Sequence, residues 1–149
     1  PISKRGDVFR QAALKALDTL SRNPDGFFLM IEGSNIDKAA HSNNLEEMME
    51  ELLDFDRTAG AVLDWAAKHP GTLVVITADH NTGAFALTGG SREKGEITAR
   101  FGSGSHDGVA VPVYAFGAGS GAFTGIYENT AIFSKIMDAF KKGAGKPVR

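Results

Sequence analysis

The chain has 149 residues, of which 42% are hydrophobic and 23% are charged, as expected for one globular domain. Sixteen basic residues against 18 acidic ones give a formal net charge of -2, and this near balance argues against binding of duplex nucleic acid, which needs a basic face. No segment has the roughly 18 successive apolar residues of a membrane span, and none has the layout of a signal peptide. The sequence contains no Cys, which excludes disulfides and thiolate metal sites.

The N-terminal part predicts a helix followed by a buried strand. Apolar residues recur at helical spacing over residues 4–22, and the turn sequence Asn-Pro-Asp-Gly at 23–26 ends this helix. Residues 27–31 then form a continuous apolar run, FFLMI. Such a run is typical of a strand that is buried on both faces of a parallel sheet.

The middle of the chain predicts a loop, a long helix and a second buried strand. Residues 33–44 are polar and loop-like, and Asn44 with Glu47 has the spacing of a capping box that opens a helix over 45–68. His69 lies at the end of this helix, where we interpret it as a structural residue that interacts with the last carbonyls. Residues 73–77, LVVIT, form the next strand. A helix between two such strands predicts a βαβ unit with parallel strands.

The C-terminal part predicts shorter elements. Residues 85–88 and 96–101 are short strands around a glycine-rich turn, and residues 109–116 form a longer strand that Pro112 assigns to a sheet edge. A flexible loop over 117–125, a helix over 130–140 and a frayed tail from 143 complete the chain. The pattern as a whole predicts an α/β fold with a mostly parallel sheet flanked by helices.

Acidic residues and histidines follow the two predicted buried strands. Glu32 comes directly after residues 27–31, and Asp79 and His80 come directly after residues 73–77. In open α/β sheets, ligands bind beyond the carboxyl ends of the strands. We therefore expect these side chains to meet at one edge of the sheet.

Three further residues, Asp37, His41 and His106, can reach the same edge of the sheet. Asp37 and His41 are four residues apart, so they share one face if their loop contains a helical turn. A carboxylate and an imidazole placed in this way suit Zn²⁺. His106 lies in a glycine-rich loop that is flexible enough to return to the site. The alternative is that these histidines are ordinary surface residues.

Two hydroxyl groups close to these residues resemble nucleophiles but have a simpler explanation. Ser34 and Thr82 are near the expected ligands in sequence. We interpret both as loop hydroxyls that bond the local backbone.

Four strings in this sequence resemble the C-terminal half of bacterial alkaline phosphatases, in the same order. They are FFLMIEG at 27–33, DKxxH at 37–41, TADH at 77–80 and SHDG at 105–108. The strings VPVYAFG at 111–117 and YENT at 127–130 are similar to that family as well. The resemblance runs from about residue 8 to residue 140. It implies a three-layer fold of which residues 1–149 form the C-terminal part.

The resemblance also implies a role for each matching residue. Asp37, His41 and His106 would hold one Zn²⁺, and Asp79 with His80 would help to hold a second. Glu32 would contribute to a Mg²⁺ site, and Lys38 would lie close to bound phosphate. The implied substrates are phosphomonoesters, the implied product is inorganic phosphate, the implied location is periplasmic or extracellular, and the family commonly forms homodimers. The site residues, listed together, are Glu32, Asp37, Lys38, His41, Asp79, His80 and His106.

Part of the family's catalytic machinery has no counterpart in this sequence. The nucleophilic serine, an aspartate that bridges the second zinc and magnesium, and a phosphate-binding arginine belong to the N-terminal half of the family. We therefore expect this chain to be inactive alone. The alternatives are a related phosphodiesterase, cofactor-independent phosphoglycerate mutase or sulfatase, and, in a different class, a non-catalytic metal-binding domain.

Overall fold

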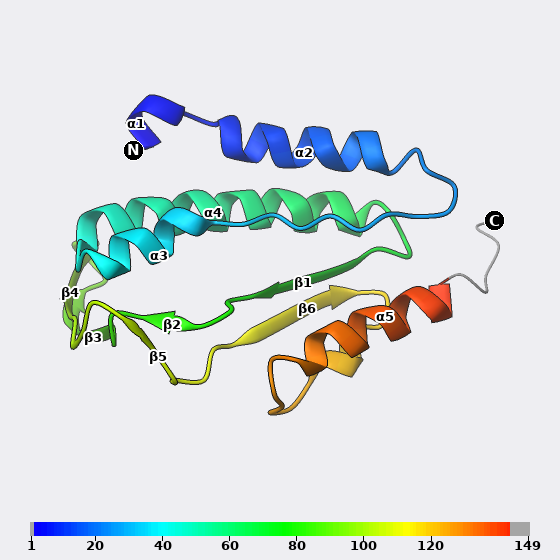
Figure 1. The fold of residues 1–149 in the computed structure, drawn as a ribbon. Helices are drawn as coiled ribbons and strands as arrows, with labels where there is room; N and C mark the ends of the chain where they lie inside the picture. Colours follow the sequence, from blue (N-terminus) through cyan, green and yellow to red (C-terminus); the bar gives the residue numbers. More distant parts are fainter. Residues whose placement is uncertain (1, 144–149) are drawn as a thin grey trace.

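The structure is a computed structural model that describes residues 2–143, with side chains described for all of these except 3, 4, 142 and 143. Figure 1 shows the elements in chain order. The helices are α1 (Ile2–Arg5), α2 (Val8–Leu20), α3 (Ser34–His41), α4 (Leu45–Ala67), the 3₁₀ helix η1 (Ser120–Phe123) and α5 (Ala131–Gly143). The strands are β1 (Leu73–Thr77), β2 (Asn81–Thr82), β3 (Ala86–Ser91), β4 (Glu96–Arg100), β5 (His106–Asp107) and β6 (Val113–Gly117).

The helix expected over 4–22 is divided into α1 and α2. Gly6 between them has a φ of 58°, which is the left-handed region that glycine adopts at little cost. Asp7 precedes α2, and its carboxylate accepts hydrogen bonds of 2.8 and 2.6 Å from Arg10. The expected tail from 143 falls almost wholly on residues 144–149, which lie outside the described residues.

Helix α4 begins where the capping box predicts. The Asn44 side chain accepts a hydrogen bond of 3.1 Å from the backbone N–H of Glu47, which satisfies one of the free donors at the helix start. At the other end, His69 Nδ1 lies 2.7 Å from the Trp65 carbonyl oxygen, and the two rings stack with centroids 3.7 Å apart. These contacts agree with a structural role for His69.

The expected loop over 33–44 contains the two-turn helix α3. Ala39 and Ala40 of this helix are buried, and they form a small apolar cluster with Met48 of α4. Phe85 and Phe101, which flank the β3–β4 hairpin, pack against the same cluster. This packing fixes α3 between α4 and the base of the hairpin.

The described strands pair only in antiparallel fashion, which corrects the parallel βαβ unit expected from residues 27–31 and 73–77. The pairs are β1 with β6, β2 with β5 and β3 with β4. Residues 27–31 are extended but form no strand, because no described backbone group bonds them. A continuous apolar run indicates a strand that is buried on both faces, but it carries no information about which neighbour supplies the hydrogen bonds or in which direction that neighbour runs.

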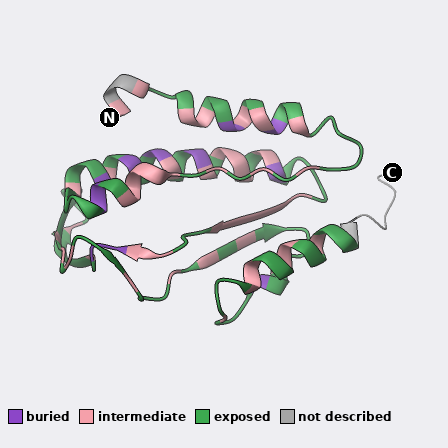
Figure 2. Ribbon diagram, in the orientation of Figure 1, coloured by how far each residue is buried: buried purple, intermediate pink, exposed green. Residues whose placement is uncertain are grey.

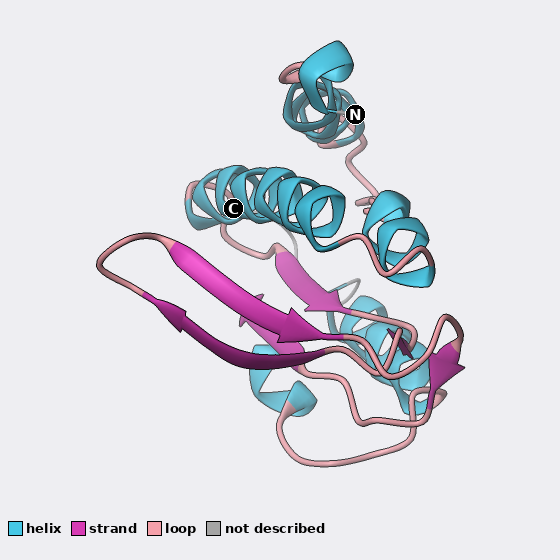
Figure 3. Cartoon of the chain, turned by 90° about the vertical axis from the view of Figure 1, so that its left-hand side faces the viewer, coloured by secondary structure: helices cyan, strands magenta, loops and turns pink. Residues whose placement is uncertain are grey.

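The layered α/β arrangement is nevertheless confirmed (Figures 1 and 3). Helix α4 packs on one side of the β1–β6 pair and η1 contacts it as well, with α5 beside η1. Helix α2 lies on the outer side of α4. The β3–β4 hairpin projects from the end of the molecule that also carries β2, β5 and α3 (Figure 3). Pro112 comes immediately before β6, so the strand expected over 109–116 begins after the proline.

Burial is concentrated on the helices, as Figure 2 shows. Neither β1 nor β6, whose residues are all described, contains a fully buried residue. Two buried groups on α4 are acidic: Glu51 and Asp54 are 6% and 3% exposed. Arg5 donates to both, at 2.7 and 2.6 Å, so the N-terminal segment is attached to α4 through an ion pair network. No helix among residues 2–143 is long and apolar enough to cross a membrane.

Candidate metal centre

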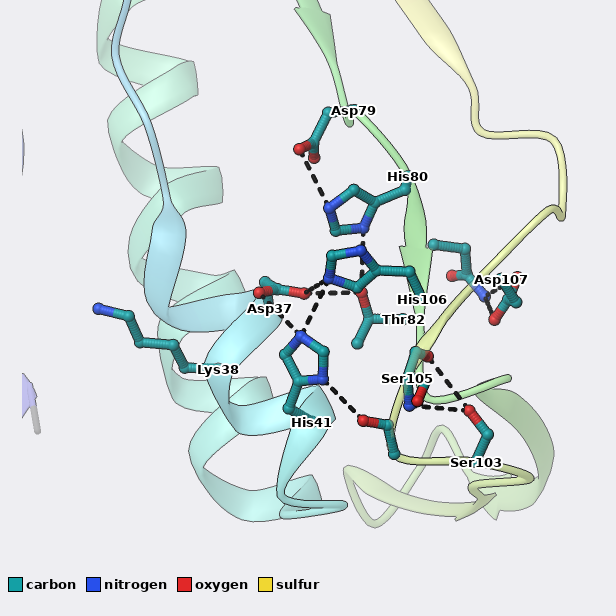
Figure 4. Close-up of polar contacts among 12 residues, drawn as sticks. Asp37, Lys38, His41, Asp79, His80, Thr82, Ser103, Ser105, His106 and Asp107 are labelled. Carbon is teal, nitrogen blue, oxygen red and sulfur yellow. Dashed lines mark hydrogen bonds and ion pairs between the residues drawn. The ribbon is translucent and has the colours of Figure 1, made fainter.

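Three side chains from two distant segments of the sequence converge at the end of the molecule that carries α3 (Figure 4). Asp37 and His41 come from α3, and His106 comes from β5. One potential ligand atom of each lies within 4.8 Å of the other two. The pairing of Asp37 with His41 at four-residue spacing is the one that the sequence predicted, and the helical turn that it required is present.

The convergence of His41 and His106 follows from three contacts between segments that are distant in the sequence. Strand β5 pairs with β2 so that His106 lies opposite Thr82, and the Gly83 N–H bonds the Ser105 carbonyl at 2.9 Å. The loop before β5 also reaches α3, since the Gly104 carbonyl oxygen lies 2.7 Å from His41 Nδ1. The glycine-rich loop is therefore held against α3 at the point where the metal ligands meet.

Asp107 anchors the strand that carries His106. Its carboxylate accepts hydrogen bonds from the Val109 N–H at 3.1 Å, the Ala84 N–H at 3.0 Å and the Asn81 side-chain amide at 3.1 and 2.9 Å. These donors, led by the Val109 N–H, hold the pKa of Asp107 below its ordinary value because they stabilise the ionised form. Asp107 was not among the predicted site residues, although it follows His106 directly.

The hydrogen bond from His41 to the loop decides which of its ring nitrogens faces the cluster. A carbonyl oxygen only accepts, so His41 Nδ1 carries the proton in the bond to Gly104. In the neutral ring, Nε2 then has a free lone pair, which points at His106 Nε2 3.0 Å away. An outer hydrogen bond of this kind is the usual way in which proteins orient a metal-ligating histidine.

The three side chains lie close enough together to bind one divalent ion. His41 Nε2 lies 3.4 Å from Asp37 Oδ2, His106 Nε2 lies 3.5 Å from the other carboxylate oxygen, Oδ1, and the two Nε2 atoms are 3.0 Å apart. Zinc binds nitrogen and oxygen ligands at about 2.0–2.2 Å in tetrahedral geometry, so neighbouring ligand atoms are expected about 3.3–3.5 Å apart. Two imidazoles and one carboxylate make a donor set that zinc accepts.

Asp79 and His80 lie beside this group. The His80 ring stacks on the His106 ring with centroids 3.5 Å apart, and His80 Nε2 is 3.1 Å from Asp79 Oδ2. The Asp79 side chain is 85% exposed. The two residues therefore offer two ligand atoms for a second metal site, which is incomplete and exposed to solvent on the side of Asp79.

Glu32 and Lys38 do not join the cluster in this structure. Glu32 is exposed and lies at a small hollow lined by Arg5 and Asn35. The Lys38 ammonium bonds Asn35 Oδ1 at 3.3 Å and points away from the histidines (Figure 4). Their assignment to magnesium and to phosphate is supported by the family resemblance alone.

The interpretation of Thr82 as a loop hydroxyl that bonds the local backbone is wrong. Its hydroxyl donates to Asp37 Oδ1 at 2.7 Å and lies 3.1 Å from His80 Nδ1. Asp37 is 45 residues away in the sequence, so no local sequence pattern predicts this contact. The only available signal was its position two residues after His80, at the same strand end.

Comparison with known proteins shows which family this chain resembles in sequence. The sequence profile of the alkaline phosphatase family matches residues 8–102, a range that contains Asp37, His41, Asp79 and His80. The chain is 31% identical over 158 residues to the alkaline phosphatase of Escherichia coli, covering 93% of this chain and 34% of that protein. It is 45% identical over 85 residues to alkaline phosphatase 4 of Bacillus subtilis, covering 57% of this chain and 18% of that protein.

Solved structures agree with the sequence comparison. The alkaline phosphatase of the Antarctic bacterium TAB5 matches with a TM-score of 0.84 and 40% identity, over 92% of this chain and 42% of that one. A mutant of the TAB5 enzyme with Mg bound in its M3 site matches with a TM-score of 0.85 and 38% identity, over 95% of this chain and 44% of that one. The chain thus spans less than half the length of these relatives. Within that span, its sequence and fold show that the chain belongs to the alkaline phosphatase family.

Proposed function

We propose that residues 1–149 form the C-terminal part of a metal-dependent alkaline phosphatase that hydrolyses phosphomonoesters with two Zn²⁺ and one Mg²⁺. The observation that carries the proposal is the convergence of Asp37, His41 and His106, whose ligand atoms lie within 4.8 Å of one another. The family match and the TAB5 fold support the reaction class.

In this proposal Asp37, His41 and His106 hold one Zn²⁺, and Asp79 with His80 contributes to the second. When bound, the two ions polarise the phosphoryl group, stabilise the leaving oxygen and lower the pKa of water. The chain's own residues supply the orientation: Gly104 fixes the ring of His41, and Asp107 fixes the strand that presents His106. A ligand set that is already in position saves the cost of ordering it when the metal or the substrate arrives.

The same structure explains why we propose that the chain is inactive alone. Asp79 and His80 provide two ligands, whereas a zinc site takes four. Several large apolar side chains are also strongly exposed, and a partner surface could cover them. Those at least 60% exposed are Phe28, Met30, Leu87, Val109, Tyr114, Ile126 and Phe133. The backbone of residues 27–31 has no bonding partner among the described residues.

We infer that the remaining part of the family's domain covers these groups and supplies the nucleophilic serine, the bridging aspartate and the arginine. Glu32 as a magnesium ligand and Lys38 as a phosphate-binding residue belong to the same proposal. The Mg in the M3 site of the TAB5 mutant shows that a member of the family binds this ion. A periplasmic or extracellular location and a homodimer are carried over from the bacterial relatives in the same way.

A chimera tests the proposal. This chain replaces the part of TAB5 alkaline phosphatase that it matches, and the product is assayed with p-nitrophenyl phosphate in Zn²⁺ and Mg²⁺, beside the unfused chain. We expect turnover by the chimera only, with His41→Ala lowering kcat at least about 100-fold because a metal ligand is lost, and His69→Ala leaving it unchanged. A folded but inactive chimera overturns the proposal, as does a preference for p-nitrophenyl sulfate or bis-p-nitrophenyl phosphate. Turnover by the unfused chain refutes the proposal that this chain is inactive alone.

A further inference from the structure

Thr82, which is not itself a candidate metal ligand, contacts both groups of candidate ligands. Its hydroxyl donates to Asp37 Oδ1 at 2.7 Å and meets His80 Nδ1 at 3.1 Å, and its backbone pairs with that of His106. The side chain is buried, with the residue 7% exposed. Figure 4 shows the hydroxyl between the two groups.

Counting protons fixes the direction of both hydrogen bonds. A threonine hydroxyl has one hydrogen to donate and two lone pairs to accept with, while a carboxylate only accepts. The single hydrogen therefore goes to Asp37, and the oxygen must accept from His80. Consequently, in the neutral imidazole, His80 Nδ1 carries the ring proton, and the lone pair of Nε2 is directed at Asp79, 3.1 Å away.

This arrangement leaves an unprotonated nitrogen facing a carboxylate, which is the pattern that a bound cation satisfies. The competing arrangement, with the proton on Nε2 and donated to Asp79, would make Nδ1 an acceptor. Thr82 would then have to donate to His80 and could not donate to Asp37. Asp37 would lose its closest side-chain partner, because its other contacts, to His41 and His106, are 3.4 and 3.5 Å long.

We propose that Thr82 is a positioning residue that links the two zinc sites, orienting the Asp37 carboxylate for one and holding His80 with a free Nε2 for the other. This role rests on the proposed function. It differs from that of Thr58, a residue of α4 that is 2% exposed and whose hydroxyl donates to the Asp54 carbonyl, at 2.9 Å, within its own helix. Thr58→Val is therefore a matched control: it also replaces a buried hydroxyl with a methyl group, but it lies outside both proposed sites.

The first measurement needs no metal. In the metal-free chain, labelled with ¹⁵N at histidine and studied at a pH of about 8.5 where imidazoles are neutral, long-range ¹H–¹⁵N spectra report which ring nitrogen is protonated. We expect His80 protonated on Nδ1 in the wild type, in Thr82→Ser and in Thr58→Val, and a shift toward Nε2 in Thr82→Val. A wild-type chain with His80 protonated on Nε2 overturns the proposal even if Thr82→Val does not fold.

The second measurement is zinc affinity by competition with a chromophoric chelator. Loss of an outer hydrogen-bond partner of a metal ligand typically weakens binding about 10–100-fold, and we expect this range for Thr82→Val. Thr82→Ser, which keeps the hydroxyl, and Thr58→Val should bind as the wild type does. Equal affinity of Thr82→Val and the wild type refutes the positioning role and leaves the proposed function intact. A wild-type chain that binds no zinc refutes the proposed function itself.

Discussion

Zinc should stabilise this chain against heat, and His41 should carry most of the effect. A ligand that binds only the folded state adds about 2.7 kcal/mol of stability when its free concentration is 100 times its Kd. Unfolding entropy is about 2 cal/mol/K per residue, so over 149 residues each kcal/mol raises Tm by about 3 °C. The wild-type chain should therefore gain about 8 °C in a zinc buffer set at that ratio, and EDTA should reverse the gain.

The structure specifies which substitution removes this gain. His41→Ala deletes one of three ligands and also breaks the contact to Gly104 that holds the loop before His106. We expect a Zn²⁺-dependent shift below about 2 °C in this variant, because two remaining ligands hold zinc far more weakly than three. His80→Ala should keep most of the shift, since the first site does not use His80.

His69→Ala is the matched control for the loss of a histidine. His69 stacks on Trp65 and contacts its carbonyl, so the variant should melt at a lower temperature without zinc. Its gain on adding zinc should equal that of the wild type. Thermal unfolding followed by circular dichroism, with free Zn²⁺ set by a metal buffer, gives all of these values. Equal shifts in the wild type and in His41→Ala would contradict the assignment of the site, and so would no shift in either.

Three further substitutions test how the scaffold is held together. Arg5→Met removes the close counter-charge of the buried Glu51 and leaves Asp54 with Arg57 alone, 3.8 Å away. Urea unfolding should show a loss of about 2–3 kcal/mol, below the 3–5 kcal/mol typical of a fully buried pair, because the Arg5 side chain is 28% exposed and Asp54 keeps this second partner. Asn44→Ala removes the cap of α4 and should cost about 1 kcal/mol in the same assay. Gly117→Ala should lower the free energy of unfolding by more than about 1 kcal/mol, since the φ of Gly117 is 90° and a Cβ would lie 2.2 Å from the Thr72 carbonyl oxygen. An unchanged urea midpoint would contradict this and show that β6 adjusts freely at this position.

Local patterns predicted the elements whose causes are local. The start of α4 follows from Asn44 and Glu47, which bond each other across one helical turn. The spacing of Asp37 and His41 predicted that they share a face, and the helix needed for this is present. These interactions span three or four residues, so the sequence displays both partners side by side.

Elements defined by distant partners could not be predicted in the same way. Residues 27–31 have the composition of a buried strand, yet a strand exists only where a neighbour supplies hydrogen bonds. The antiparallel pairing of β1 with β6 joins segments about 40 residues apart, and an apolar run carries no sign of its partner's direction. The interpretation of Thr82 as bonding the local backbone is wrong for the same reason, since its hydroxyl bonds Asp37.

The distribution of ligands has a consequence for the order in which the site is assembled. Asp37, His41 and His106 are oriented by contacts within the chain, namely the bonds to Gly104 and Thr82 and the β2–β5 pairing. Asp79, by contrast, is 85% exposed, and its one described side-chain contact is to His80. Under the proposed assignment, the first zinc would therefore bind before the rest of the domain is present, whereas the second would require ligands from outside this span. Because Thr82 joins the two sets, occupation of the first site would hold its hydroxyl toward Asp37 and keep His80 Nε2 free for the second.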